Sequence, residues 1–397
     1  MQNSNAFDSE NRRRCSLSEV AVLFLKLGSI GFGGPAALIA LIQDEVVNRR
    51  KWMSGEHFLD LVGVTNLIPG PNAVEMAIHC GYHRAGFWGL LLAGFCFIIP
   101  AAVISGIFAW FYVQYQTMPQ FESFVYGIKP AVLALIAGAI YHLGRKSLKN
   151  VVLGVLGAGV IAASLLGINE IVVIFAGGFV GMFVLRVAKE WRAKNAFFLP
   201  LLSAGGFAAK AGTDSVFSSL SLTNLFLVFL KTGAVIFGSG YVLVAYLDGD
   251  LVNRLGWLTK SELIDAIAVG QFTPGPVFSA ATFIGYKLLG FSGAALATVG
   301  FLLPSFILVL IANPLVPKLR QSKWAGEFLD AVNVSAIGLI AAVAFKLGRD
   351  ILIDWKTIVI ACISFAVVFG FRKINSTFIV LGGMVTGYLL KIISNLF

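Results

Sequence analysis

Charged residues are scarce in this sequence. Asp, Glu, Lys and Arg make up 13% of the 397 residues, whereas a soluble domain usually carries about 25%. Hydrophobic residues make up 58%, and the mean hydropathy is +0.86. A water-facing surface cannot be built from this composition, which excludes a soluble globular protein. The apolar runs do not alternate with polar residues, which excludes an outer-membrane β-barrel.

Residues that carry redox or metal chemistry are also few. The four cysteines form no CxxC pair, and the four histidines have no ligand spacing for haem, an iron–sulfur cluster or flavin. His79 and His83 are four residues apart, but such a pair without further ligands is more often not a metal site. We therefore expect no metal, no cofactor and no enzymatic activity. The net charge of +10 fits lipid headgroups, and we expect no nucleic-acid partner.

Long apolar runs, in contrast, recur along the whole chain. An example is "GFWGLLLAGFCFIIPAAVISGIFAWFYV" at 86–113. Runs of about 20 such residues are typical of transmembrane helices. The first 16 residues are polar, and no short apolar stretch with a cleavage site follows them, so we expect no cleaved signal peptide. The sequence predicts an all-α integral membrane protein that crosses the lipid bilayer several times.

The chain also contains an internal sequence duplication. At an offset of 205, "VVNRRKWMSGEHFLD" (46–60) matches "LVNRLGWLTKSELID" (251–265), and other ordered matches extend over nearly the whole length. We divide the chain into a first repeat (1–190), a linker with a possible extra membrane segment (191–220) and a second repeat (221–397). Internal duplication of this kind is common in secondary transporters.

Each repeat contains six apolar segments, which predicts about 12 to 13 membrane segments in all. They lie near 18–47, 57–80, 86–113, 124–144, 150–167 and 170–187, and near 222–248, 262–286, 290–313, 328–347, 351–370 and 376–395. The loop "QYQTMPQFE" (114–122) has no basic residue, whereas its counterpart "NPLVPKLRQSKW" (313–324) has three. Because Lys and Arg favour the cytoplasmic side, we expect the two repeats to have inverted orientations.

Two prolines flank a glycine in the middle of one segment of each repeat, at "LIPGPN" (67–72) and "FTPGPV" (272–277). Proline removes a backbone donor and disfavours helix in the preceding residue. We expect a broken or re-entrant helix at Gly70–Pro71 and at Gly275–Pro276. A helix that begins inside the membrane directs free N–H groups at its surroundings, which suits an anion. The alternative is a simple proline kink.

A second matched interruption lies at "GFGGP" (31–35) and "FGSG" (237–240). Gly33, Gly34 and Gly238 there are candidates for a second broken helix that lines the same cavity. Close packing of small residues is the alternative. Asn66, Asn72, Gln271 and Thr273 flank the PGP breaks and could donate hydrogen bonds to an oxyanion, or could join helices as polar contacts.

Lys26 and Lys231 occupy equivalent positions inside the first apolar run of each repeat. A lysine within a membrane segment usually marks a solute pathway or an ion pair, so both are candidate substrate-binding residues. The alternative is that they extend to the membrane interface.

Three carboxylates are candidates for coupling to protons. Asp60 aligns with Asp265 before each break, and Glu75 follows the first break, where the second repeat has Ala280. A buried carboxylate near an anion site could carry a proton. The alternative for Glu75 is a local pair with His79, one helical turn further on.

The ordered set of these motifs resembles the chromate ion transporter family in its long, two-domain form. The residues that carry the resemblance are "FGGP" (Phe32, Gly33, Gly34 and Pro35), "NRRKWMSGEHFLDLVGVTNLIPGPNA" (48–73) and the copy "FTPGP". In the second repeat, Ser239 and Gly240 stand where Gly34 and Pro35 do, so the two repeats need not contribute equally. The resemblance implies a multi-pass protein of the bacterial inner membrane that exports chromate, driven by the proton motive force, and confers chromate resistance.

Several alternatives stay open at this stage. Sulfate has nearly the shape and charge of chromate, so a sulfate or related oxyanion transporter is equally compatible with the motifs. An anion channel is also compatible with them, and a homodimer is an open assembly state. A membrane reductase is disfavoured by the lack of cofactor motifs.

Overall fold

The computed structural model describes residues 17–31, 34–66, 68–115, 119–192, 219–237, 240, 242–313, 323–371 and 376–396. Within these ranges all regular structure is helical and no strand occurs, which confirms the all-α prediction. Most of the linker, with its possible extra segment, lies outside the described residues.

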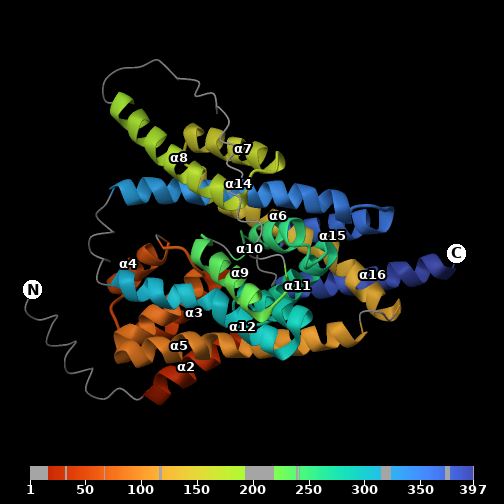
Figure 1. Ribbon diagram of the computed structural model, residues 1–397, viewed down its shortest axis with the longest axis horizontal. Helices are drawn as coiled ribbons and strands as arrows, with labels where there is room; N and C mark the ends of the chain where they lie inside the picture. Colours follow the sequence, from red (N-terminus) through yellow and green to blue (C-terminus); the bar gives the residue numbers. More distant parts are fainter. Residues whose placement is uncertain are drawn as a thin grey trace, which may run out of the picture.

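The helices of the second repeat follow those of the first in the same order (Figure 1). The first repeat contains α2 (Leu17–Ile30), α3 (Gly34–Gln43), the π-helical turn η2 (Asp44–Arg49), α4 (Gly55–Thr65), α5 (Asn72–Tyr115), α6 (Pro119–Ser147), α7 (Val151–Leu165) and α8 (Glu170–Arg192). The second contains α9 (Leu222–Val235), α10 (Val242–Leu247), η3 (Asp248–Arg254), α11 (Lys260–Phe272), the 3-10 turn η4 (Val277–Ser279), α12 (Ala280–Ala312), α14 (Lys323–Ile351), α15 (Trp355–Gly370) and α16 (Ser376–Leu396).

Four helices of the described chain are long and apolar enough to cross a membrane. They lie within Asn72–Tyr115, Tyr126–Ser147, Val277–Ala312 and Gly326–Ile351. These are α5 and α6 and their counterparts α12 and α14, so the two repeats contribute equivalent crossings.

The longest helices, α5 and α12, each contain a sharp reversal. Gly86 has a φ of 62° and Gly290 a φ of 63°, in the left-handed region that glycine tolerates. A Cβ on Gly81 would collide with the carbonyl oxygen of Gly89, although eight residues of straight helix span about 12 Å. The chain therefore doubles back at 85–86, so that a short first arm (72–84) packs against the long second arm (87–115).

The apolar runs at 18–47, 57–80, 222–248 and 262–286 are not single crossings, because each is divided into shorter helices. α4 has 11 residues and is about 16 Å long, whereas the hydrocarbon core is about 30 Å thick. α4 and the first arm of α5 thus form a re-entrant hairpin whose tip is the PGP sequence. The prediction of broken or re-entrant helices is confirmed.

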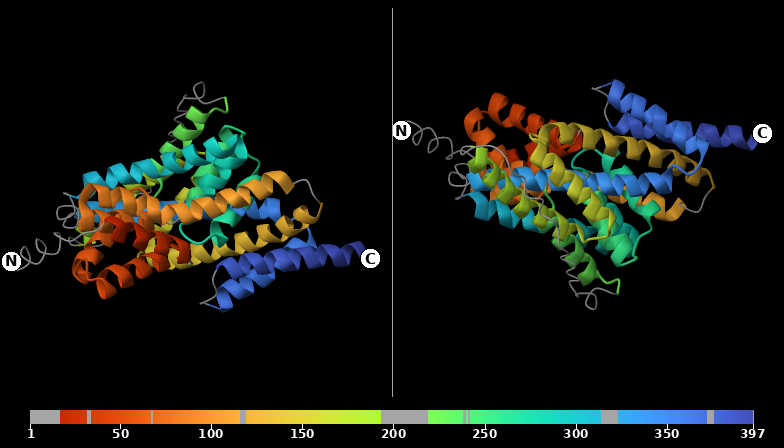
Figure 2. Two further views of the ribbon diagram at one scale, coloured as in Figure 1. Left: turned by 90° about the horizontal axis from the view of Figure 1, so that it is seen from below. Right: turned by 90° about the horizontal axis from the view of Figure 1, so that it is seen from above.

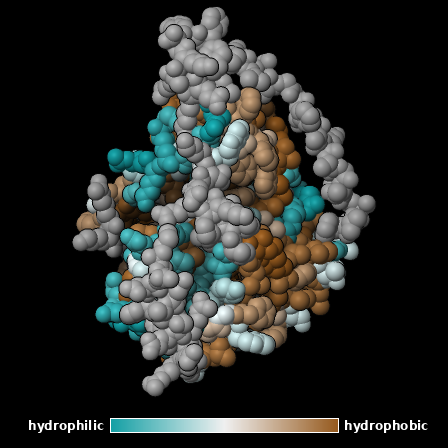
Figure 3. Space-filling view, turned by 90° about the vertical axis from the view of Figure 1, so that its left-hand side faces the viewer, coloured by the Kyte–Doolittle hydropathy of each residue, from teal (hydrophilic) through white to brown (hydrophobic). Residues whose placement is uncertain are grey.

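The equivalent helices of the two repeats run in opposite directions (Figures 1 and 2). α5 ends and α6 begins at the right-hand end of Figure 1, whereas α12 ends and α14 begins at the left-hand end. The repeat is therefore inverted, as the loop charges predict. Hydrophilic residues lie on the left-hand end (Figure 3), where α12 ends and α14 begins.

The outer helices are exchanged between the repeats. α6 packs on α15 and α16, whereas α14 packs on α7 and α8. Glycines allow these close approaches: a Cβ on Gly127 of α6 would collide with the carbonyl oxygen of Gly383 on α16, and one on Gly178 of α8 would lie 2.6 Å from Val332 of α14. Dispersion contacts and close backbone approach drive helix association in lipid, so these glycines hold the two repeats together.

We predict that Gly127→Leu destabilises the protein by about 1–3 kcal/mol through overpacking at the α6–α16 contact. The measurement is thermal unfolding of the detergent-solubilised protein. Gly382→Leu is the matched control, because no atom lies within 4 Å of a Cβ at that neighbouring glycine of α16. Equal melting temperatures for the two variants would contradict the exchanged packing.

Candidate functional site

The first interruption divides the first apolar run of each repeat. α2 ends at Ile30 and α3 begins at Gly34, and in the second repeat α9 ends at Val235 and α10 begins at Val242. The break predicted at "FGGP" is therefore present, with Gly34 as the first residue of the new helix. Gly33 and Gly238, which we selected with it, lie outside the described residues.

The second interruption lies at the PGP sequences. α4 ends at Thr65 and α5 begins at Asn72, directly after Pro71, as expected for a proline that precedes a helix start. In the second repeat α11 ends at Phe272, and a 3-10 turn follows Pro276 before α12 begins. Gly70 and Gly275 have φ values of 147° and 99°, which only glycine adopts easily.

The two interruptions meet across the repeats through a reciprocal pair of hydrogen bonds. The Gly70 N–H donates to the Ile236 carbonyl at 2.7 Å, and the Gly275 N–H donates to the Gly31 carbonyl at 2.6 Å. Ile236 and Gly31 are equivalent residues that follow α9 and α2. The breaks thus lie at the repeat interface, as predicted. However, the amides of Gly70 and Gly275 are occupied by these carbonyls, so our expectation of free donors does not hold at these two positions.

The polar side chains at the two tips differ in exposure. At the first tip Asn66 is exposed and Asn72 is half-buried, and the Asn72 amide donates to Asn66 Oδ1 at 2.5 Å. At the second tip Gln271 and Thr273 are buried, and the Thr273 hydroxyl donates to the Val269 carbonyl at 2.6 Å. The first tip therefore exposes the Asn66 amide group. At the second tip both side chains are buried, and the Thr273 hydroxyl group is bonded to a carbonyl of its own helix.

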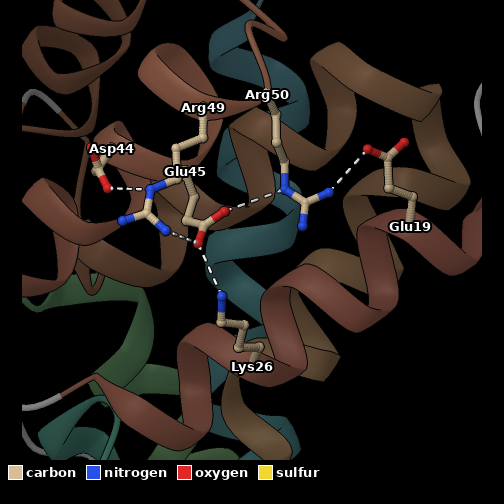
Figure 4. A network of polar contacts seen from close by, with 6 residues as sticks. All are labelled: Glu19, Lys26, Asp44, Glu45, Arg49 and Arg50. Atoms are coloured by element: carbon tan, nitrogen blue, oxygen red, sulfur yellow. Dashed lines mark hydrogen bonds and ion pairs between the residues drawn. The ribbon is translucent and has the colours of Figure 1, made fainter.

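Lys26 is part of a network of charged residues (Figure 4). Its ammonium group lies 3.1 Å from Glu45 Oε1, and Arg49 and Arg50 each approach the same carboxylate at 3.4 Å. The Glu45 side chain is 8% exposed and that of Lys26 is 50% exposed. Three cations surround one buried carboxylate, which is thereby held ionised, while half of the lysine surface stays accessible.

The network continues toward α2 and the end of the first arm of α5. Arg50 also binds Glu19 at 3.1 Å, and Arg84 binds the same carboxylate at 3.3 Å. Arg49 binds Asp44 at 2.8 Å as well (Figure 4). The ends of α2, η2 and α5's first arm are therefore tied together by charge.

The second repeat preserves the centre of this network. Lys231 binds Asp250 at 2.6 Å, and Arg254 binds Asp250 at 3.1 Å. Both candidate lysines are thus ion-paired to a carboxylate 19 residues later. Glu45 and Asp250 were missed by the sequence reasoning, although they align at the offset of 205 that defines the repeat.

The three coupling candidates have different surroundings. Asp265 is buried and accepts a hydrogen bond from the Tyr112 hydroxyl at 2.8 Å, whereas Asp60 is half-buried. Glu75 is fully buried, and neither of its oxygens has a hydrogen-bond partner in the described part of the chain. The local Glu75–His79 hydrogen bond considered as the alternative is therefore not formed.

Glu75 lies directly against the first PGP tip. A Cβ on Gly70 would collide with Glu75 Oε1 and would lie 2.9 Å from the Ser305 hydroxyl oxygen on α12. At the second tip, Ala101 of α5 lies against Gly275 in the same way, and Ala280 has the position of Glu75 at the offset of 205. Only the first tip therefore has a carboxyl and a hydroxyl group behind it.

Comparison with known proteins agrees with this geometry. The model of the family "Chromate transporter" matches residues 18–182 and 223–388, one match for each repeat. A "Chromate transport protein" of Cupriavidus metallidurans is 30% identical over 376 residues, which cover 94% of this chain and 92% of that protein. A "Probable chromate transport protein" of Synechococcus elongatus is 32% identical, with 88% and 89% covered. An uncharacterized transporter of Methanocaldococcus jannaschii is 28% identical, with 98% of both chains covered. No solved structure matches the chain.

We predict that Gly70→Ala reduces uptake of labelled chromate into everted membrane vesicles by about tenfold. The added methyl group collides with Glu75 and strains a positive-φ residue, at a cost on the order of 1–3 kcal/mol. Gly63→Ala on α4 is the control, because a Cβ there meets no atom within 4 Å. Unchanged uptake by Gly70→Ala at equal membrane content would show that the tip has no part in transport.

We predict that Lys26→Met slows chromate uptake and lowers thermal stability by about 1 kcal/mol, because Glu45 loses one partner. The double variant Lys26→Met/Glu45→Gln is expected to regain stability but not uptake. Lys149→Met, which breaks a 2.7 Å pair with Asp330 elsewhere, should leave uptake unchanged. Full uptake by the double variant would mean that Lys26 serves only the ion pair.

Proposed function

Because the chain belongs to the chromate transporter family, we propose that it is a secondary active transporter that exports chromate across the cytoplasmic membrane and so confers chromate resistance. The observation that carries this proposal is the meeting of the two PGP breaks across an inverted repeat. Discontinuous helices at a repeat interface are the usual location of substrate sites in such transporters.

Chromate is a tetrahedral dianion, and the site offers several donors that suit it. α3 begins at Gly34 and α5 at Asn72, and the first N–H groups of a helix carry partial positive charge. The exposed Asn66 and the half-buried Asn72 beside it add neutral amide groups. In our proposal the substrate-binding set comprises Lys26, Lys231, Gly33, Gly34, Gly238, Asn66, Gly70, Pro71, Asn72, Gln271, Thr273, Gly275 and Pro276, with Gly70 and Gly275 acting as tip-forming residues.

The lysine networks supply long-range attraction for the anion. Three cations contact Glu45 and two contact Asp250, and each lysine keeps part of its surface accessible. Since the repeats are inverted, the Lys26 and Lys231 networks occupy equivalent places relative to opposite membrane surfaces. An anion entering from either side therefore meets a similar set of charges, which suits alternating access.

The membrane potential alone favours export of a dianion. Moving one elementary charge through 100 mV is worth about 2.3 kcal/mol, so two negative charges leaving a negative interior gain about 4.6 kcal/mol. In our proposal the proton gradient adds to this through a carboxylate that binds a proton, and Glu75 is the strongest candidate, ahead of Asp60 and Asp265. Transport of sulfate or a related oxyanion, or passive conduction as a channel, are the competing functions.

We predict that everted vesicles containing the protein accumulate labelled chromate and that excess sulfate competes with it. Collapse of the potential with valinomycin and potassium should slow accumulation, and collapse of the pH gradient with nigericin should slow it further. These additions separate the two parts of the driving force. Uptake confined to right-side-out vesicles would contradict export.

Glu75→Gln provides the internal comparison for this experiment. It keeps the shape of a protonated carboxyl and cannot release a proton, so it should retain the valinomycin-sensitive part of the flux and lose the nigericin-sensitive part. Accumulation by the wild type that valinomycin abolishes and nigericin leaves unchanged would indicate a channel. Preference for sulfate with no chromate flux would assign the protein to sulfate.

A further inference from the structure

Three titratable side chains form a row along the first arm of α5. Glu75, His79 and His83 are spaced by four residues, which places them on one face of a helix. Glu75 and His79 are 0% and 1% exposed, whereas His83 is half-buried. The row therefore runs from the buried PGP tip toward the membrane surface, where Arg84 binds Glu19.

A third histidine lies beside this row. His57, on the partner arm α4, is half-buried, and its ring centroid lies 5.0 Å from that of His83. His57 is also close enough to His79 to interact with it electrostatically. Three of the four histidines of the chain thus lie on one re-entrant hairpin, together with the buried carboxyl group of Glu75.

The equivalent hairpin of the second repeat lacks every member of the row. At the offset of 205 that aligns the PGP sequences, Ala280 and Ile284 replace Glu75 and His79. At the offset of 204 that aligns Gly81 with Gly285, Ser279 and Phe283 take these places, so neither alignment puts a carboxyl or an imidazole group there. At the surface end, Glu262 and Lys287 replace His57 and His83 and form an ion pair at 2.7 Å. Because both hairpins have the same backbone arrangement, the four titratable groups are not required by the fold.

We propose that this row is a proton pathway that links Glu75, behind the PGP tip, to the cytoplasmic surface through His79 and the His57–His83 pair. The inference deepens the proposed function, on which it rests only for the use made of the proton. A proton moves by making and breaking O–H and N–H bonds alone, with histidine accepting it on one ring nitrogen and releasing it from the other.

The unsatisfied polar atoms of the row favour this role. Both oxygens of Glu75 are buried without hydrogen-bond partners in the described residues, an arrangement that costs free energy unless it serves a function. The ring nitrogens of His79 are buried as well, and the polar group beside them is the side chain of Asn313. The Ser305 hydroxyl beside Glu75 is likewise buried without such a partner and could donate to the ionised carboxylate. The described residues contain no group of three or more ligands suited to a metal ion.

The charged groups around the row lie near its surface end, away from Glu75. No charged side chain of the described residues acts on the Glu75 carboxyl. His79 has two polar neighbours, His57 and Asn313, the residue that follows α12. The charged groups further out are Asp60 on α4 and the Arg84–Glu19 pair. A change in Glu75 charge would therefore act mainly on the adjoining Gly70 tip and its hydrogen bond to Ile236.

The test uses the purified full-length protein in liposomes and follows the infrared band of the protonated Glu75 carboxyl, identified by its absence in Glu75→Gln. On transfer to heavy water, His79→Leu is expected to slow the exchange of this band on the order of a hundredfold. His79→Gln keeps a polar side chain that cannot accept and release a proton, so it should slow exchange similarly. His142→Gln, at an exposed histidine of α6, should exchange as the wild type does.

A second measurement records proton flux with a pH-sensitive dye inside the liposomes while chromate is added. His79→Leu should lower the chromate-induced proton flux and leave potential-driven chromate flux in place. Wild-type exchange and proton flux in both His79 variants would overturn the pathway, as would the absence of a Glu75 band in the wild type. The exchange measurement needs no substrate, so failure of the protein to move chromate would refute the proposed function and not this inference.

Discussion

The reciprocal hydrogen bonds between Gly70 and Ile236 and between Gly275 and Gly31 are the contacts on which the rest of the structure depends. A helix that stops inside a membrane leaves carbonyl groups unsatisfied, and lipid cannot satisfy them. Each PGP tip supplies the missing donor to the helix end of the other repeat. One tip alone would solve the problem at only one end, which gives a physical reason for the duplicated interruption. The inverted repeat and the paired breaks are thus two aspects of one requirement.

The parts of the architecture that sequence predicts are those encoded locally. Proline and glycine at the PGP sequences break helices wherever they occur, and the offset of 205 reveals the repeat. The reversal at Gly86 was not predicted, because a glycine in a helical run gives no sign that the chain doubles back. The exchange of α6 and α14 and the Asp265–Tyr112 hydrogen bond depend on contacts far apart in sequence, which no local pattern encodes.

The two repeats share the residues that form the fold, and they differ at residues that only one repeat needs. The tips, the reversals and the Lys–carboxylate–Arg networks occur in both repeats. Glu75 and the three hairpin histidines occur in the first repeat alone, and an ion pair or uncharged residues take their place in the second. Ser305 of the second repeat lies against the first tip, whereas Ala101 of the first repeat lies against the second tip. Alternating access by an inverted repeat requires two similar scaffolds, whereas binding of one coupling ion requires one site. In our proposal the shared residues therefore serve the conformational change, and the unshared residues serve coupling to the proton.

The ion pairs also bear on which anions the protein can accept. Lys26 and Lys231 are already bound to carboxylates, and Glu45 and Asp250 are too buried to be left alone at low cost. An incoming anion must therefore share the lysine and cannot simply replace its partner. Coulomb attraction scales with charge, so a dianion competes for this shared cation about twice as strongly as chloride or nitrate does. In our proposal such a site favours doubly charged anions, and discrimination between chromate and sulfate comes from hydrogen-bond geometry at the tips.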